Sequence, residues 1–380
     1  MKIGIPKEIE KDETRVAVIP AMVPQLTKNE HEVFVESGAG AKAFFPDAEY
    51  EKAGAKLVKD VEKLYGEADV VIKFQAPQRN TKLGKHELDM MKEGAALISS
   101  LPPRVHKEVM PTLLKKRVTS FAMEYLPRIT KAQSMDVMSS MSTVAGYKAV
   151  LIAADHLAKF FPLLMTAAGT IPPATVLILG AGVAGLQAIA TAKRLGAKVS
   201  AFDPRPVVRE QVESLGAQFI EMEVPEDVET AGGYAKEQSE DFLNRERDVI
   251  GAQLPKVDAL ITTAQIFGKT SPLLVTKKML ESMKPGSVVV DLAVAEGGNC
   301  ELSKPNQVVE HKGITIYGVV NLARTLPIHA SQMHSKNVTT FFNHVFQGPE
   351  GKLDFDEEIT KGTCITHNGE IVHPMVKQNF

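Results

Sequence analysis

The sequence is poor in cysteine and in net charge, and it has no long apolar run. Only two of its 380 residues are cysteines, Cys300 and Cys364, which suits a reducing cytosol. Neither the cysteines nor the histidines have the spacing of metal ligands, so we expect no bound metal. The formal net charge is −2, which excludes the basic surface of a nucleic-acid-binding protein. No uninterrupted apolar run reaches about 18 residues, so no membrane-spanning helix is expected.

The remaining composition is that of an ordinary globular protein with two domains. Apolar residues make up 44% of the chain and charged residues 24%, which is enough for real hydrophobic cores. A length of 380 residues favours two domains. The first residues, MKIGIPKE, are typical of a strand and not of a signal peptide.

The most informative stretch is TVLILGAGVAGLQAIATAKRLGAKVSAFD, residues 175–203. A β-branched apolar run, Thr175 to Leu179, predicts a buried strand, and Lys198 to Phe202 predicts a second one. Between them, residues 186–195 carry apolar side chains at helical spacing. Strand, glycine turn, helix, strand and acid follow in the order of a dinucleotide-binding unit.

Each glycine of the G-x-G-x-x-G spacing has a physical task. Gly180 allows the tight turn, Gly182 lets the backbone approach a pyrophosphate, and Gly185 lets the helix lie close to the strand. The following helix N-terminus suits a diphosphate. Asp203 lies roughly 20 residues beyond the glycines, where a carboxylate accepts hydrogen bonds from the adenosine ribose. Its charge favours NAD over NADP, although Arg205 could soften that preference.

Residues 1–125 alternate strand-like and helix-like segments and carry no second glycine fingerprint. This alternation predicts another open, largely parallel sheet with helices on both faces. The expected strands are Lys2–Ile5, Glu32–Glu36, Ala55–Val58, Ala68–Phe74, Ala95–Ser99 and Val118–Ala122.

Two basic residues in this first segment have two interpretations each. Arg15, in ETRVAVIP, is either an anion-binding group or part of a surface ion pair, and its spacing favours the ion pair. Lys73, in VVIKFQAP, either lines a ligand crevice at the end of a strand or extends its charged end to solvent.

The segment PRITKAQSMDVMSS, residues 127–140, has a polar pattern of its own. Gln133, Asp136 and Ser139 follow three-residue spacing and share roughly one face of a helix or turn. Arg128 could fold back onto Asp136 and so hold a loop from which an amide projects, as a nucleotide clamp would. A solvated helix start with capping residues explains the pattern equally well.

Long helices and loops complete the chain. Helices are expected at residues 145–161 and 327–346, as connections between the domains. The acidic stretch Glu221 to Asp248 suggests an exposed excursion, either a lid, a partner-binding arm or an ordinary surface loop. A short hairpin is expected around Asn368–Gly369. We predict two Rossmann-like α/β domains with a cleft between them, residues 1–130 with 328–380 and residues 131–327.

Several stretches together resemble one family. They are IPKE…ETRVAVIP, VVIKFQAP, AMEYLPRITKAQSMDVMSS, TAAGTIPPATVLILGAGVAGLQAIATAKRLGA, ETAGGYAKE, DLAVAEGGNCELS and GTCITHNGEIVHP. The sequence is similar, over essentially its whole length, to the NAD(H)-binding component, domain I, of proton-translocating nicotinamide nucleotide transhydrogenase. It resembles the form in which this component is a separate alpha-subunit polypeptide.

The resemblance implies a function and partners. NAD(H) would bind here, in a homodimer located peripherally on the cytoplasmic side of the inner membrane. Hydride would pass directly to or from NADP(H) on the beta subunit (domain III), and a membrane-spanning domain II would translocate protons. The enzyme would be active only with these partner subunits.

The resemblance also assigns site residues. The nicotinamide would be positioned by Arg128, Ile129, Gln133, Asp136 and Ser139, with Gln133 reaching toward the partner domain. The remaining contacts to the dinucleotide would come from Gly180, Gly182, Val183, Asp203, Pro204, Arg205 and Gln265, and from a mobile loop with Gly233 and Tyr234. Direct transfer between two nicotinamides needs distance and orientation rather than an acid/base pair.

Alanine dehydrogenase is the nearest alternative, because Arg15 and Lys73 match its substrate-binding residues. Its two proton-handling positions do not match: Ser100 stands in place of a histidine and Ala295 in place of an aspartate. Oxidative deamination needs such groups, so these departures favour the transhydrogenase component. A nucleotide-sensing module without turnover is a further alternative, which exchange with the partner would distinguish.

Overall fold

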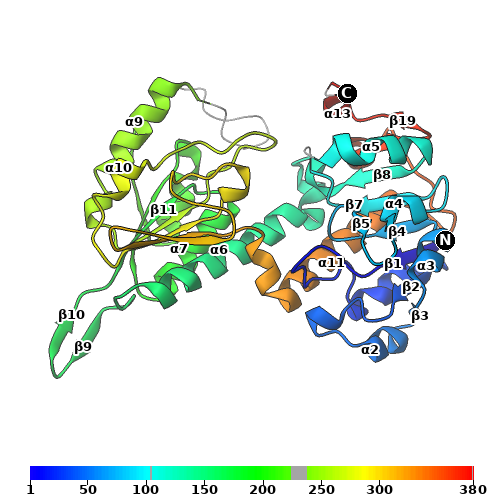
Figure 1. Ribbon diagram of the computed structural model, residues 1–380, viewed down its shortest axis with the longest axis horizontal. Coiled ribbons are helices and arrows are strands. Elements are labelled where there is room, and N and C mark those ends of the chain that lie inside the picture. The colour runs from blue at the N-terminus through cyan, green and yellow to red at the C-terminus, as the bar shows by residue number, and fades with distance from the viewer. Residues whose placement is uncertain (103–104, 224–237, 379) are drawn as a thin grey trace. The chain divides into compact units, whose positions relative to one another are not determined.

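The protein divides into two compact units, each of which is built around its own sheet. In the computed structural model, residues 1–102, 105–223, 238–378 and 380 are described. The first unit comprises Met1–Met141 and Arg324–Phe380, and the second comprises Ser142–Ala323. The ribbon in Figure 1 shows one sheet in each unit, flanked by helices. The predicted class of two open, largely parallel α/β sheets is confirmed.

The sheet of the first unit is parallel except at one edge. Its strand order is β19-β18-β8-β7-β4-β1-β2-β3, and the strands from β8 to β3 run parallel. The exception is the edge beyond β8, where β18 pairs antiparallel with β8 and β19 pairs antiparallel with β18. The strands are β1 (Lys2–Ile5), β2 (Glu32–Glu36), β3 (Lys56–Val58), β4 (Val70–Ile72), β7 (Ala96–Ser99), β8 (Thr119–Ala122), β18 (Cys364–His367) and β19 (Glu370–Ile371).

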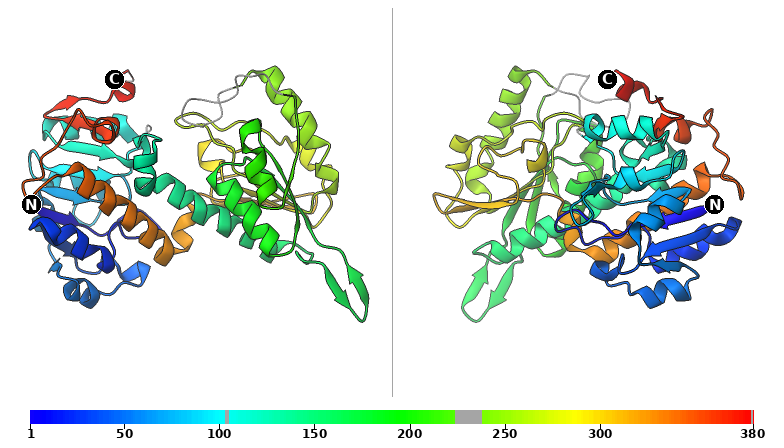
Figure 2. Two further views of the ribbon diagram at one scale, coloured as in Figure 1. Left: turned by 180° about the vertical axis from the view of Figure 1, so that it is seen from behind. Right: turned by 45° about the vertical axis from the view of Figure 1, so that its right-hand side comes forward.

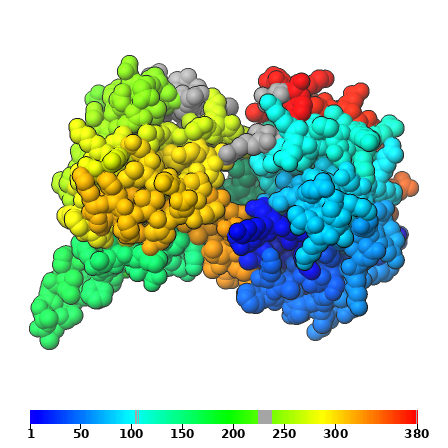
Figure 3. Space-filling model, viewed as in Figure 1, coloured from blue at the N-terminus to red at the C-terminus, as the bar shows by residue number. Residues whose placement is uncertain are grey.

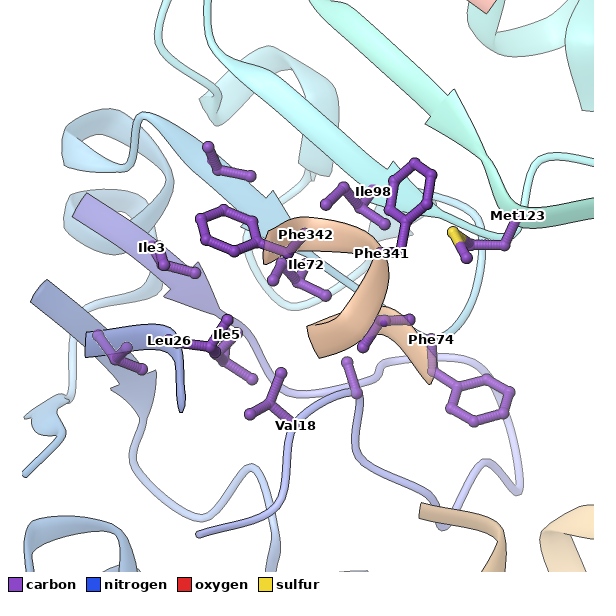
Figure 4. Close-up of a cluster of buried hydrophobic side chains, with 14 of the residues drawn as sticks. Ile3, Ile5, Val18, Leu26, Ile72, Phe74, Ile98, Met123, Phe341 and Phe342 are labelled. Atoms are coloured by element: carbon purple, nitrogen blue, oxygen red, sulfur yellow. The ribbon is translucent and has the colours of Figure 1, made fainter. Parts of the chain in front are cut away.

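Both faces of this sheet are covered, which explains why its central strands β4, β7 and β8 are buried along their whole length. On one face, the helix α11 (Pro327–Val345) places Phe341 and Phe342 in a cluster with Ile3, Ile72 and Ile98 (Figure 4). On the other face lie the short helices α3 (Val61–Glu67) and α4 (Glu87–Met90), together with α5 (His106–Lys115). The smaller elements are α1 (Val23–Leu26), α2 (Asp47–Lys52), β5 (Arg79–Asn80), β6 (Lys85–His86), α12 (Glu358–Thr363) and α13 (Pro374–Lys377).

The second unit has the strand order of a dinucleotide-binding sheet. The order is β13-β12-β11-β14-β15-β17-β16, in which only β16 runs antiparallel to its neighbour. Numbered within the unit, the parallel strands follow the order 3-2-1-4-5-6, which reverses between β11 and β14. The strands are β11 (Thr175–Leu179), β12 (Lys198–Phe202), β13 (Gln218–Phe219), β14 (Ala259–Thr262), β15 (Val288–Asp291), β16 (Gln307–His311) and β17 (Ile314–Gly318).

Helices cover this second sheet as well. They are α7 (Val183–Arg194), α8 (Arg209–Ser214), α9 (Glu240–Gly251), α10 (Lys277–Leu280) and the portion of α6 (Val137–His156) that belongs to the unit. By length and composition alone, α6 is apolar enough to cross a membrane. Its residues Ala149, Val150 and Ala153 are fully buried in the core of the second unit, so part of its apolar surface is used in packing.

A β-hairpin extends from the second unit beyond its sheet. It is formed by β9 (Leu164–Thr166) and β10 (Gly169–Ile171), and it stands clear of the rest of its unit in Figures 2 and 3. Met165 is 79% exposed and Leu163, just before the hairpin, 53%. The sequence pattern does not predict these strands.

Candidate dinucleotide site

The glycine turn lies where the strand order of the second sheet reverses. The chain leaves β11 at Leu179, turns through Gly180 and enters α7, whose N-cap is Gly182. Gly180 has a φ of 91°, which favours glycine, and a Cβ there would lie 2.6 Å from Oγ1 of Thr263. In open α/β sheets, ligands bind outside the carboxyl ends of the strands at such a reversal.

The other two glycines of the fingerprint have opposite surroundings. A Cβ on Gly185 would lie 1.8 Å from the carbonyl oxygen of Gly180, so helix and strand are in backbone contact. A Cβ on Gly182 would meet no atom within 4 Å. The space over Gly182 and the first-turn N–H groups of α7 therefore fit a pyrophosphate. Val183, the first residue of α7, is 38% exposed beside that space.

A fourth glycine, Gly146, lies outside the fingerprint and supports the same turn. A Cβ on Gly146 of α6 would lie 2.1 Å from the carbonyl oxygen of Ala184. The helix α6 thus packs directly against the backbone of the first turn of α7. Nothing in the local pattern around Gly146 signals this contact, because it depends on tertiary packing.

Asp203 anchors the glycine turn from the end of β12. Its Oδ2 accepts a hydrogen bond from the N–H of Ala181 at 2.7 Å, and its side chain is buried. Arg205 pairs with the same carboxylate, with Nε 2.9 Å from Oδ1 and Nη2 2.8 Å from Oδ2. The N–H of Arg205 also donates to Oδ1, so the backbone curls around Pro204. A ribose hydroxyl reaching Asp203 would share the carboxylate with Arg205.

The opposite side of the turn is formed by the loop after β14. Oγ1 of Thr263 donates to the carbonyl oxygens of Leu179 and Gly180, at 3.2 and 3.1 Å. Gln265 is exposed, and its Nε2 donates to the carbonyl of Leu292 at 3.2 Å. The structure therefore brings Gln265 to the same sheet edge as the glycine turn.

Two buried side chains, Asn299 and Asp291, hold these loops. Asn299 accepts from the N–H of Ala264 at 3.0 Å and donates to the carbonyl of the same residue at 2.9 Å. Asp291 accepts from Oγ1 of Thr262 at 2.9 Å and from the N–H of Asn299 at 3.0 Å. Asp291 is fully buried and braces the loops after β14 and β15.

The predicted nicotinamide-positioning residues lie in the first unit, before and within the start of α6. A 3₁₀ helix spans Thr130–Met135, with Arg128 and Gln133 exposed and Ile129 packed against the core. Asp136 accepts from the N–H of Ser139 at 2.9 Å and from its hydroxyl at 2.6 Å. Asp136 thus caps α6, while its expected pairing with Arg128 remains a prediction. Gly233 and Tyr234 lie outside the described residues.

Arg15 forms an ion pair as expected, but the pair is buried and not on the surface. Its Nη2 lies 2.6 Å from Oε2 of Glu13, and both side chains are at most 2% exposed. Burial acts to raise the pKa of Glu13, but the hydrogen bonds and charge of Arg15, together with the amide of Gln75, lower it to about 2. The guanidinium also lies over the ring of Phe74.

Lys73 neither lines an open crevice nor reaches solvent. Its Nζ lies 2.9 Å from Glu87 and 3.2 Å from Glu8, and all three side chains are buried. Burial alone would lower the pKa of Lys73, but the charges of Glu8 and Glu87 raise it above its ordinary value. Both basic residues are therefore held by carboxylates of the chain itself.

Ser100 and Ala295 stand where alanine dehydrogenase is expected to have its two proton-handling residues. Ser100 donates its hydroxyl to Glu124, whose other oxygen accepts from the N–H of Leu101 at 2.9 Å. Burial raises the pKa of Glu124. Ala295 lies in a 3₁₀ turn, Val294–Glu296, and its methyl group is exposed. The contacts of Ser100 and Leu101 with Glu124 anchor two loops of the first sheet to each other, and neither position 100 nor position 295 carries an imidazole or a carboxylate.

Fold and site together define a doubly wound dinucleotide-binding protein with a second α/β unit. Comparison with known families agrees: the N-terminal domain model of alanine dehydrogenase/PNT matches residues 4–145, and the C-terminal domain model matches residues 149–374. The chain is 46% identical, over 98% of each sequence, to the polypeptide that forms the first segment of NAD(P) transhydrogenase subunit alpha in Rhodospirillum rubrum.

Solved structures give the same result. A transhydrogenase from Sinorhizobium meliloti superposes with a TM-score of 0.86 at 41% identity, covering 98% of this chain and 100% of that one. An L-alanine dehydrogenase superposes with a TM-score of 0.80 at 27% identity, covering 100% and 98%. The chain belongs to the alanine dehydrogenase/PNT family and, within it, to the alpha subunits of NAD(P) transhydrogenase.

Proposed function

We propose that this chain is the component that holds NAD(H) for direct hydride exchange with NADP(H) on a partner subunit, coupled to proton translocation by a membrane component. One observation carries the proposal. The chain keeps a complete dinucleotide turn, Gly180 to Val183 tied to Asp203, while Ser100 and Ala295 replace the proton-handling residues of alanine dehydrogenase.

The residues of the second unit would bind the dinucleotide along the edge of the sheet. Gly180, Gly182 and Val183 would hold the pyrophosphate, because Gly182 leaves space above its Cα and α7 begins there. Asp203, Pro204 and Arg205 would take the adenosine ribose, and Gln265 would lie beside the nucleotide. When bound, NAD(H) supplies the transferable hydride at its nicotinamide ring.

The residues of the first unit would orient the ring. The exposed amide of Gln133 and the guanidinium of Arg128 project from a short segment whose end is fixed by Asp136 and Ser139. Such a segment can set distance and angle without supplying a proton. Ile129 would pack beside these groups.

The buried pairs of Arg15 and Lys73 favour this function over alanine oxidation. By resemblance, these two positions match the substrate-binding arginine and lysine of alanine dehydrogenase. Here Glu13 occupies Nε and Nη2 of Arg15, and Glu8 and Glu87 both contact Lys73. A small carboxylate would have to displace buried partners, and breaking a buried pair costs about 3–5 kcal/mol.

The proposal includes a homodimer, placed peripherally on the cytoplasmic face of the inner membrane beside the beta subunit and the membrane component. The hairpin of β9 and β10 supports dimer formation. It exposes Met165, Ile171 and the neighbouring Leu163 on a projecting two-stranded ribbon. Isolated two-stranded ribbons are marginally stable in water, so this one gains by packing against a second copy.

The test compares the purified chain alone and with its NADP(H)-binding partner. Alone, the chain should bind NADH in a fluorescence titration and should not reduce NAD⁺ in the presence of alanine. Adding the partner should produce exchange between NADH and an NADP⁺ analogue. Alanine oxidation by the chain alone would establish the dehydrogenase function instead. NADH binding without exchange in the complete complex would leave a sensing module and refute the proposal.

A further inference from the structure

The short segment that carries Gln133 is held by a residue of α11, almost 200 positions further along the chain. In this 3₁₀ helix, Gln133 and Ser134 are exposed between two buried residues. The side chain of Asn337, on α11, is buried, and its Nδ2 donates a hydrogen bond to the carbonyl oxygen of Ser134 at 2.8 Å. The last carbonyl groups of a helix have no partner within it, so Asn337 supplies one at the end of this helix.

A second contact orients the amide of Asn337. Oγ of Ser140, in the first turn of α6, donates to Oδ1 of Asn337 at 2.6 Å. A backbone carbonyl can only accept, so the amide nitrogen faces Ser134 and the amide oxygen is left for the hydroxyl. Asn337 therefore joins the end of the 3₁₀ helix to the start of α6, and all three residues belong to the first unit.

The backbone at Gln133 has only a long hydrogen bond across the turn that follows. Its carbonyl oxygen accepts from the N–H of Asp136 at 3.4 Å, which is longer than the roughly 2.7–3.2 Å of ordinary N–H···O bonds. The bond from Asn337 to the next carbonyl, that of Ser134, is 2.8 Å long and lies well within that range. Without Asn337, the exposed pair Gln133 and Ser134 could therefore shift relative to α11.

We propose that Asn337 is a positioning residue for hydride transfer, which acts by fixing the backbone from which the Gln133 amide projects. The inference rests on the proposed function, because it assumes that Gln133 orients the nicotinamide ring. A misplacement of about an ångström can slow a reaction by a factor on the order of 10². The pyrophosphate and ribose are proposed to bind to the second unit, so losing Asn337 should affect transfer much more than NADH affinity.

The test uses Asn337→Ala and Asn337→Asp in the complete complex with the NADP(H)-binding partner. Alanine removes both contacts, whereas aspartate keeps an acceptor for Ser140 and removes only the donor to Ser134. Ser335→Ala is the matched control, because Ser335 is buried on the same helix and its Oγ accepts from the N–H of Ile19 at 2.9 Å. Stopped-flow mixing measures hydride transfer, fluorescence titration measures the dissociation constant for NADH, and thermal unfolding confirms that each variant is folded.

We expect both Asn337 variants to transfer hydride at least about tenfold more slowly, with NADH affinity changed by less than about twofold. Ser335→Ala leaves a buried N–H unpaired and should lower the Tm, but it should transfer hydride at the unaltered rate. An unaltered rate in either folded Asn337 variant, an equal slowing in Ser335→Ala, or a loss of NADH affinity as large as the loss of rate would overturn the inference. Absence of hydride exchange in the unaltered complex would instead refute the proposed function.

Discussion

Replacing Gly182 or Gly185 by alanine should have different effects. Gly185→Ala should lower the stability of the fold, whereas Gly182→Ala should weaken nucleotide binding. In Gly185→Ala, the new Cβ would lie 1.8 Å from the Gly180 oxygen and 2.9 Å from its carbonyl carbon. Real Cβ contacts are essentially never below 3.0 Å, and both atoms are backbone, so β11 and α7 must move apart by more than 1 Å.

The cost of this movement can be worked from the packing. Overpacking a core typically costs about 1–3 kcal/mol, and a clash with two backbone atoms belongs at the upper end. A loss of about 3 kcal/mol in a unit of this size lowers the Tm by about 6–12 °C, at about 2–4 °C for each kcal/mol. We therefore expect Gly185→Ala to unfold well below the unaltered protein.

Gly182→Ala should behave in the opposite way. Its Cβ meets no atom within 4 Å and its φ is −75°, so the free energy of unfolding should change by less than about 1 kcal/mol. The methyl group would occupy the space proposed for the pyrophosphate. The dissociation constant for NADH should rise at least tenfold, or about 1.4 kcal/mol.

Circular dichroism on heating and fluorescence titration with NADH, applied to both variants, measure the two effects. Undiminished NADH affinity in Gly182→Ala would refute the placement of the pyrophosphate. An unchanged Tm in Gly185→Ala would refute the packing argument.

Two other predictions concern the first unit. With the partner subunit present, Gln133→Asn should slow hydride transfer in stopped-flow mixing by a factor on the order of 10², since small misplacements are costly; NADH affinity should change far less, and equal losses would contradict a positioning role. Glu13→Gln leaves the buried Arg15 unpaired and should lower the free energy of unfolding in guanidinium by about 3–5 kcal/mol. The folded-state pKa of Glu13 is lowered to about 2, so its contribution is complete above the unfolded pKa of about 4.3 and is lost as the pH falls toward 2. The unaltered protein should therefore lose about 3 kcal/mol more than Glu13→Gln between about pH 6 and pH 2; equal acid sensitivity would show that Glu13 is not the group responsible.

The sequence predicts an element of the fold correctly where its local pattern is compatible with only one kind of secondary structure. Thr175–Leu179 and Lys198–Phe202 form strands with the predicted bounds, because buried parallel strands are short apolar runs that end at turn residues. The hairpin around Asn368–Gly369 is confirmed as well. Both residues have positive φ, 51° and 85°, as a tight two-residue turn between antiparallel strands requires.

Two elements are not predicted, because their sequences lack a regular helical or alternating apolar pattern. The acidic stretch Glu221 to Asp248 was expected to be an exposed excursion, but its end forms α9, which begins at Glu240. Glu246 stands in the middle of the buried face of this helix and masks the apolar period. The hairpin of β9 and β10 was missed because its strands are three residues long and largely exposed, without an alternating pattern.

Side-chain partners far apart in the chain were beyond sequence reasoning. Lys73 meets Glu8 across 65 positions, and no local pattern distinguishes this buried pair from a lysine at the edge of a crevice. The close approach of Gly146 to Ala184 is of the same kind. The fingerprint itself was predictable because all of its groups lie within about 30 residues, as such a unit requires.

The central claim is that hydride passes directly from NADH on this chain to NADP⁺ on its partner. The most direct measurement mixes the complete complex with NADH that carries deuterium on its transferable position at nicotinamide C4, and follows the label by NMR. The account predicts that the NADPH formed contains the deuterium without dilution by solvent hydrogen. Deuterium lost to water, so that the NADPH formed carries solvent hydrogen instead of the label, would contradict it.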